Sequence, residues 1–119
     1  MLVVDDHPVV REGLLAMLST DTGVEVVGEA GSGEEAVEKA ALLKPDVVLA
    51  DIRMPGMNGI EATRRIKEAQ PGAAVIVLTM YDSEAYVVEA LRAGAAGYLV
   101  KDVSRDLLCH TIHAVAGGG

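Results

Sequence analysis

Short runs of apolar residues alternate along the chain with segments in which apolar side chains recur every three or four positions. The runs predict β-strands, and the periodic segments predict helices that each have one packing face. The predicted strands are Leu2–Val4, Val24–Glu29, Val47–Ala50, Ala74–Leu78 and Gly97–Val100. The predicted helices are about Val9–Ser19, Gly33–Leu43, Ile60–Ala69, Ser83–Ala93 and Arg105–Ala116.

Glycine and proline residues fall between these predicted elements. Pro8 suits the first turn of the first helix, the Gly31-Ser32-Gly33 stretch separates a strand from a helix, and Gly94 is placed to cap the fourth helix. Strands that are almost continuously apolar and are joined by helices are typical of a parallel sheet buried on both faces. Five such units with right-handed crossovers predict an α/β fold, a doubly wound sandwich.

Polar side chains stand where the predicted strands end. Asp5 and Asp6 follow the first strand, and Asp51 follows the apolar run of the third. The carboxyl ends of parallel strands share one edge, where open α/β sheets bind ligands. Three acids in one small volume repel each other, so either one is protonated or a cation such as Mg²⁺ holds them. Asp5 and Asp6 also suit a helix N-terminus.

Asp51 has no role as a helix cap, because the next helix begins beyond Pro55 and Gly59. Beside a bound cation, its carboxylate is a possible nucleophile toward phosphorus. Thr79 ends the fourth strand and is either an ordinary β-branched residue or a hydrogen-bond donor to a phosphoryl oxygen. Lys101 ends the fifth strand and is either solvated or paired with Asp51, and with a phosphoryl oxygen after transfer.

Length and charge narrow the class of protein. The 119 residues suffice for one domain, and with no Trp or Phe its core must consist of aliphatic residues and Met. The net charge of -8 argues against nucleic-acid binding by this domain itself, since such binding depends on Lys and Arg. A lone cysteine, Cys109, and the lack of a membrane-length apolar stretch or signal peptide predict a cytoplasmic protein without membrane contact.

Four stretches together resemble a two-component response-regulator receiver domain: Val4-Asp5-Asp6-His7-Pro8, Asp51-Ile52-Arg53-Met54-Pro55-Gly56-Met57-Asn58-Gly59, Leu78-Thr79 and Gly97-Tyr98-Leu99-Val100-Lys101. Two further stretches resemble the LuxR-type (NarL-type) subfamily: Val9-Val10-Arg11-Glu12-Gly13-Leu14 and Ala90-Leu91-Arg92-Ala93-Gly94-Ala95-Ala96-Gly97-Tyr98-Leu99. The resemblance covers essentially the whole chain. It implies a flavodoxin-like (βα)5 sandwich with strand order 2-1-3-4-5.

The same resemblance implies a receiver domain over residues 1–116. Residues 117–119 would begin a linker to a helix-turn-helix output domain, although a triple glycine is also compatible with a frayed terminus. Asp51 would accept a phosphoryl group from a sensor histidine kinase. Asp5, Asp6, Asp51 and the backbone carbonyl of Arg53 would hold Mg²⁺.

The resemblance further implies that Thr79 and Lys101 bind the phosphoryl oxygens, and that Tyr98 is a switch aromatic that turns inward as Thr79 moves. Tyr98 can also be read simply as a half-buried strand residue. Arg53, Met80 and Tyr81 would modulate the lifetime of the phosphoryl group; receivers commonly have a small residue at the position of Met80. Phosphorylation would favour a homodimer, and DNA would be bound through the output domain to regulate transcription.

Two other functions use similar residues. A Mg²⁺-dependent aspartyl phosphatase of the haloacid-dehalogenase type has a second Asp two residues after its nucleophile, where this chain has Arg53. A pseudo-receiver would serve only as a scaffold. We therefore expect a phosphoacceptor that promotes its own phosphorylation and dephosphorylation, not an enzyme with a separate substrate.

The histidines and the cysteine have simpler interpretations. His7 lies next to the acids, but imidazole is a poor ligand for Mg²⁺. The spacing of His110 and His113 on the last predicted helix can bind zinc, yet no third ligand is evident and a solvated or interface face is favoured. Cys109 is interpreted as a packing residue.

Overall fold

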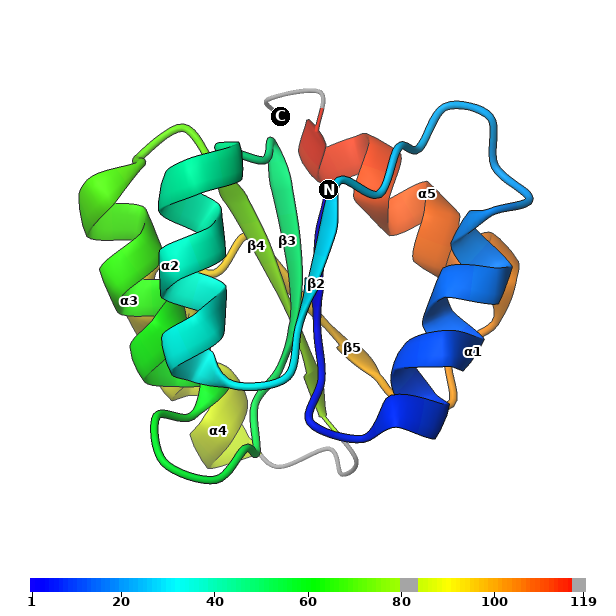
Figure 1. Ribbon diagram of the computed structural model, residues 1–119. Coiled ribbons are helices and arrows are strands. Elements are labelled where there is room, and N and C mark those ends of the chain that lie inside the picture. Colours follow the sequence, from blue (N-terminus) through cyan, green and yellow to red (C-terminus); the bar gives the residue numbers. More distant parts are fainter. Residues whose placement is uncertain (80–83, 117–119) are drawn as a thin grey trace.

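The computed structural model describes residues 1–79 and 84–116, which form a parallel five-stranded sheet between two layers of helices (Figure 1). The strands are β1 (Leu2–Val4), β2 (Gly28–Ala30), β3 (Val47–Asp51), β4 (Ala74–Thr79) and β5 (Gly97–Val100). The helices are α1 (Pro8–Leu18), α2 (Gly33–Leu43), α3 (Gly59–Ala69), α4 (Glu84–Ala93) and α5 (Arg105–Ala116). The spatial order β2-β1-β3-β4-β5 confirms the predicted fold class.

Alternate strand residues feed two separate hydrophobic clusters, as the pleat of a strand requires. In β3, Val48 and Ala50 join the cluster on the α2, α3 and α4 side, whereas Val47 and Leu49 join the cluster on the α1 and α5 side. Figure 1 shows these two helix layers on opposite faces of the sheet. Because both faces are covered, almost every β3 and β4 side chain is buried, which explains the continuous apolar runs in the sequence.

The second strand was predicted to begin four residues too early. The sequence pattern predicted Val24–Glu29, but only Gly28–Ala30 pairs with β1. β1 has three residues and therefore offers three partners. Before this ladder, Val27 N–H donates to the carbonyl of Met1 at 2.8 Å, and Val24 N–H closes a turn onto Asp21 at 3.2 Å.

Side-chain caps and special backbone conformations end the helices as expected. Pro8 occupies the first turn of α1, and Asn58 caps α3 by accepting the N–H of Glu61 at 3.0 Å. Asp51 is therefore not needed as a cap. Gly94 follows α4 with a φ of +112°, a conformation that residues with a side chain rarely adopt.

Some of the predicted functional residues are not among the residues that the structure describes. Met80, Tyr81 and the predicted linker residues 117–119 lie outside the described residues. Within the described part of the chain, no helix combines the length and the apolar character needed to cross a membrane.

Candidate functional site

The carboxyl ends of β1 and β3 bring the predicted acids together. Parallel pairing places Val4 opposite Ala50, so Asp5, which follows β1, and Asp51, the last residue of β3, lie at the same level. Ligand atoms of Asp5, Asp6, His7 and Asp51 all lie within 4.8 Å of one another. Asp5 is fully buried and Asp51 is 2% exposed, so this is a buried acidic site, as the sequence predicted.

Lys101 reaches this site from the end of β5. Its Nζ donates a hydrogen bond to Oδ2 of Asp51 at 2.9 Å and lies 3.2 Å from Oδ2 of Asp5. The predicted pairing with Asp51 is confirmed. One buried ammonium thus faces two buried carboxylates.

The charges of this group perturb one another. Burial raises the pKa of Asp51 above its usual value, and the nearby charge of Asp5 raises it further, while the hydrogen bond from Lys101 only partly offsets these effects. Burial works against the charge of Lys101, but its contacts with Asp51 and Asp5 outweigh burial and raise the pKa of its ammonium. Asp51 is consequently held in a site that disfavours its negative charge.

Two carboxylate oxygens of the site have no hydrogen-bond donor. Oδ2 of Asp5 and Oδ1 of Asp6 are both buried and lack a hydrogen bond, although Lys101 and His7 lie close to them. Buried carboxylate oxygens without a hydrogen bond, in a group of three carboxylates with ligand atoms within 4.8 Å of one another, fit a hard divalent cation such as Mg²⁺. The residues present therefore fit the predicted metal.

Hydrogen bonds from backbone N–H groups hold the loop after β3 in its position. Arg53 N–H donates to Oδ1 of Asp51 at 3.2 Å, and Gly59 N–H donates to the carbonyl of Ile52 at 2.8 Å. A Cβ at Gly59 would lie 2.0 Å from the carbonyl oxygen of Asp51, so only glycine permits this approach. The loop thereby fixes the Asp51 carboxylate relative to the backbone of Arg53.

Thr79 completes the site from the end of β4. It is 6% exposed, and its carbonyl accepts the N–H of Lys101 at 2.9 Å. Thr79, Lys101, Asp51 and Arg53 line one pocket with a volume of about 330 Å³, together with His7 and Val10. The structure thus brings the proposed acceptor and both proposed phosphoryl ligands to a single pocket.

Tyr98 lies outside this pocket. It is opposite Val77 in the sheet and is 42% exposed, and its side chain borders surface pockets on the α4 and α5 sides. This exposure agrees with the interpretation of Tyr98 as a half-buried strand residue.

The structure shows contacts of His7 and Arg11 that the sequence did not predict. Nδ1 of His7 lies 3.0 Å from Oδ1 of Asp6 and 3.3 Å from Oδ1 of Asp5, so His7 belongs to the acidic group. Arg11 Nη1 donates to the carbonyl of Asp5 at 2.6 Å and fixes the acidic loop. These contacts depend on the angle between α1 and the sheet, for which the sequence carries no local signal.

The two histidines and the cysteine of α5 do not belong to the acidic group. Cys109 is buried, in accord with its interpretation as packing, and burial raises the pKa of its thiol. Nε2 of His113 lies 2.7 Å from Oδ2 of Asp21. Among residues 1–79 and 84–116, the group around Asp5 is the one cluster with metal-ligand spacing, and it does not include His110 or His113.

Comparison with known proteins agrees with this geometry. Residues 1–113 match the family model of the response regulator receiver domain. The response regulator GacA of Pseudomonas viridiflava is 44% identical over 118 residues, which are 99% of this chain and 55% of GacA. The chain thus spans about half the length of such relatives.

Solved structures show the same similarity. The receiver domain of the putative response regulator NarL from Mycobacterium tuberculosis superposes with a TM-score of 0.95 at 39% identity, covering 99% of this chain and 95% of that one. CheY in a CheX-CheY-BeF3-Mg complex from Borrelia burgdorferi gives 0.88 at 32% identity, covering 96% and 86%. With its sheet order, its acidic strand ends and these relatives, the chain belongs to the receiver domains of LuxR/NarL-type two-component response regulators.

Proposed function

We propose that Asp51 accepts a phosphoryl group from a sensor histidine kinase and that the resulting acyl phosphate switches the domain between two conformations. The observation that carries this proposal is the position of Lys101, whose ammonium contacts both Asp51 and Asp5 at the edge of the sheet. In this arrangement an incoming phosphorus can reach the Asp51 carboxylate. The Lys101 ammonium lies beside it and can bind the negative charge of the transferred phosphoryl group.

In the proposed reaction, a carboxylate oxygen of Asp51 attacks the phosphorus of a phosphohistidine. The P–N bond breaks, its electron pair stays on the imidazole nitrogen, and an acyl phosphate forms on Asp51. Lys101 then moves its hydrogen bond from Oδ2 of Asp51 to a phosphoryl oxygen, and the Thr79 hydroxyl donates to another. Water reverses the modification by attacking the acyl phosphate, so the domain promotes both steps on itself.

The metal site of this proposal consists of Asp5, Asp6, Asp51 and the backbone carbonyl of Arg53. These residues would hold Mg²⁺, which when bound would supply positive charge next to the phosphoryl group. The two unsatisfied oxygens, Oδ2 of Asp5 and Oδ1 of Asp6, support this assignment. The Borrelia relative, whose structure contains BeF3 and magnesium, lends further support.

The proposed switch runs through Thr79 and Tyr98. Movement of Thr79 toward the phosphoryl group opens space next to β5, and the ring of Tyr98 turns into it. Arg53, Met80 and Tyr81 are proposed to set how long the phosphoryl group remains. We further propose that the modified domain forms a homodimer and controls a DNA-binding output domain in the cytoplasm, in line with relatives that are named as transcriptional regulators.

Incubation with acetyl phosphate and Mg²⁺ tests the proposal. The expected product is one phosphoryl group per chain, stable in acid, labile in base and absent from Asp51→Asn. Asp46→Asn, which changes an exposed aspartate just before β3, is the matched control and should be modified normally. Sedimentation with and without the phosphodonor reports whether the modified chain dimerises.

Each other outcome contradicts the proposal in a different way. Continuous release of phosphate, with no accumulated adduct, identifies a phosphatase. Lack of any adduct, with the metal bound, identifies a scaffold. An adduct that survives in Asp51→Asn places the acceptor at another residue.

A further inference from the structure

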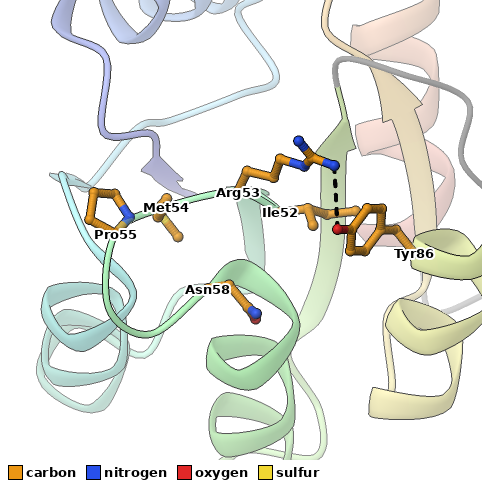
Figure 2. A pocket seen from close by; sticks show the side chains of 6 residues that line it. All are labelled: Ile52, Arg53, Met54, Pro55, Asn58 and Tyr86. Atoms are coloured by element: carbon orange, nitrogen blue, oxygen red, sulfur yellow. Dashed lines mark hydrogen bonds between the residues drawn. The ribbon is translucent and has the colours of Figure 1, made fainter.

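Arg53 lies between two pockets of the molecule. Arg53 lines the pocket that contains Asp51, Thr79 and Lys101. It also lines a second pocket of about 430 Å³ between the β3–α3 loop and α4 (Figure 2). In this second pocket Nη2 of Arg53 donates to the hydroxyl of Tyr86 at 3.3 Å. Cζ of Arg53 is 5.0 Å from the centre of the Tyr86 ring, within the range of a cation–π contact.

Tyr86 lies in the less firmly held half of α4. This helix buries two residues, Ala90 and Ala93, and both are in its C-terminal half. In the N-terminal half Tyr86 and Val87 are partly buried, and Tyr86 packs against the core cluster. The contact with Arg53 therefore ties the N-terminal half of α4 to the loop that carries Asp51.

A phosphoryl group on Asp51 would compete for the same guanidinium. It adds a charge of about -1.5 to -2 and three strong acceptor oxygens. Arg53 N–H already donates to Oδ1 of Asp51 at 3.2 Å, so the residue starts next to the modified carboxylate. A guanidinium binds phosphate oxygens through charge-assisted, often bidentate, hydrogen bonds, which are stronger than one bond to a neutral phenol.

We infer that Tyr86 is a positioning residue that holds the Arg53 guanidinium on α4 in the unmodified domain, and that phosphorylation of Asp51 draws the guanidinium away and releases the N-terminal half of α4. The second half of this inference rests on the proposed function, whereas the first half does not. The Arg53–Tyr86 contact would thereby couple the acceptor loop to α4 independently of Thr79 and Tyr98.

Hydrogen exchange on the unmodified chain tests the first half. The amides of residues 88–90 have their helical acceptors in residues 84–86, so they report opening of this half of α4. Arg53→Gln removes both the cation–π contact and the hydrogen bond and should speed their exchange about two- to fivefold. Tyr86→Phe keeps the ring, removes only the hydroxyl and should speed their exchange about twofold. Arg64→Gln, which removes an exposed arginine paired with Glu61, is the control and should leave it unchanged. Unchanged exchange in both Arg53→Gln and Tyr86→Phe would overturn the inference.

Titration with beryllium fluoride and Mg²⁺ tests the second half. Tyr86→Phe should raise the affinity about twofold, because the guanidinium no longer has to give up its hydrogen bond to the phenol. In the Arg53→Gln background, Tyr86→Phe should have no effect, since the two residues act through each other. An equal effect of Tyr86→Phe with and without Arg53 would refute release by competition. If the unchanged chain does not bind beryllium fluoride, the proposed function fails and release fails with it, but the exchange result for the unmodified domain still stands.

Discussion

Asp51→Asn should stabilise the metal-free protein, although it removes the proposed functional residue. Asp51 is 2% exposed and shares the ammonium of Lys101 with the fully buried Asp5. At an effective dielectric constant of about 20, its attraction to Lys101 at 2.9 Å amounts to about 6 kcal/mol. Repulsion from each of Asp5 and Asp6, with ligand atoms inside 4.8 Å, amounts to about 3.5 kcal/mol or more.

The two repulsions together exceed the one attraction, and burial of the charge adds a further cost. Lys101 keeps Asp5 as a partner after this change. We therefore expect Asp51→Asn to raise the free energy of unfolding at neutral pH by about 1 kcal/mol or more, the excess of the two repulsions over the one attraction. Urea denaturation followed by circular dichroism measures this difference. Glu68→Gln, which neutralises an exposed carboxyl on α3, is the matched control and should change little.

The pH dependence of the stability difference also tests whether Asp51→Asn stabilises the protein. Burial raises the pKa of Asp51 in the fold, so the folded chain binds a proton more tightly than the unfolded chain does. The contribution of Asp51 to the stability of the wild type therefore falls as pH rises from the ordinary aspartate pKa of about 3.9 to the raised value. The advantage of Asp51→Asn should be complete above this window and should shrink below it. A less stable Asp51→Asn at neutral pH without metal would refute the reasoning.

Three further changes have defined outcomes. Lys101→Met leaves Asp5 and Asp51 without their cation and should lower the free energy of unfolding by about 3 kcal/mol in urea; a loss near zero would show that the pair contributes little. Gly59→Ala places a Cβ 2.0 Å from the Asp51 carbonyl and should cost about 1–3 kcal/mol, whereas Gly13→Ala, with open space around it in α1, should cost nothing. The N–H of Gly23 and the ring of His113 lower the pKa of Asp21. The Asp21 carboxylate therefore stabilises the fold at neutral pH, and this stabilisation is lost as pH falls through the lowered pKa. In thermal melting, the midpoint temperature of Asp21→Asn should fall less at acid pH than that of the wild type. An equal fall in both proteins would contradict this prediction.

The sequence by itself determined the layer architecture and the edge on which the chemistry lies. The continuous apolar runs of β3 and β4 can be buried only when both faces of the sheet are covered, and the helices between them require parallel strands. From that topology alone, Asp5, Asp51, Thr79 and Lys101 had to reach one edge. The second strand was predicted too long at its start, because strand length depends on the partner and β1 offers only three residues.

Tertiary structure decided the contacts between side chains that are remote in sequence. Whether Lys101 bonds to Asp51, to Asp5 or to water depends on the stagger of β5 against β3, to which it is joined only through β4. The contact of Arg53 with Tyr86 spans 33 residues and depends on where α4 sits on α3. Hydrophobic periodicity specifies which face of a helix is buried, but the final position of the helix results from packing all its neighbours together, and that position decides which polar groups meet.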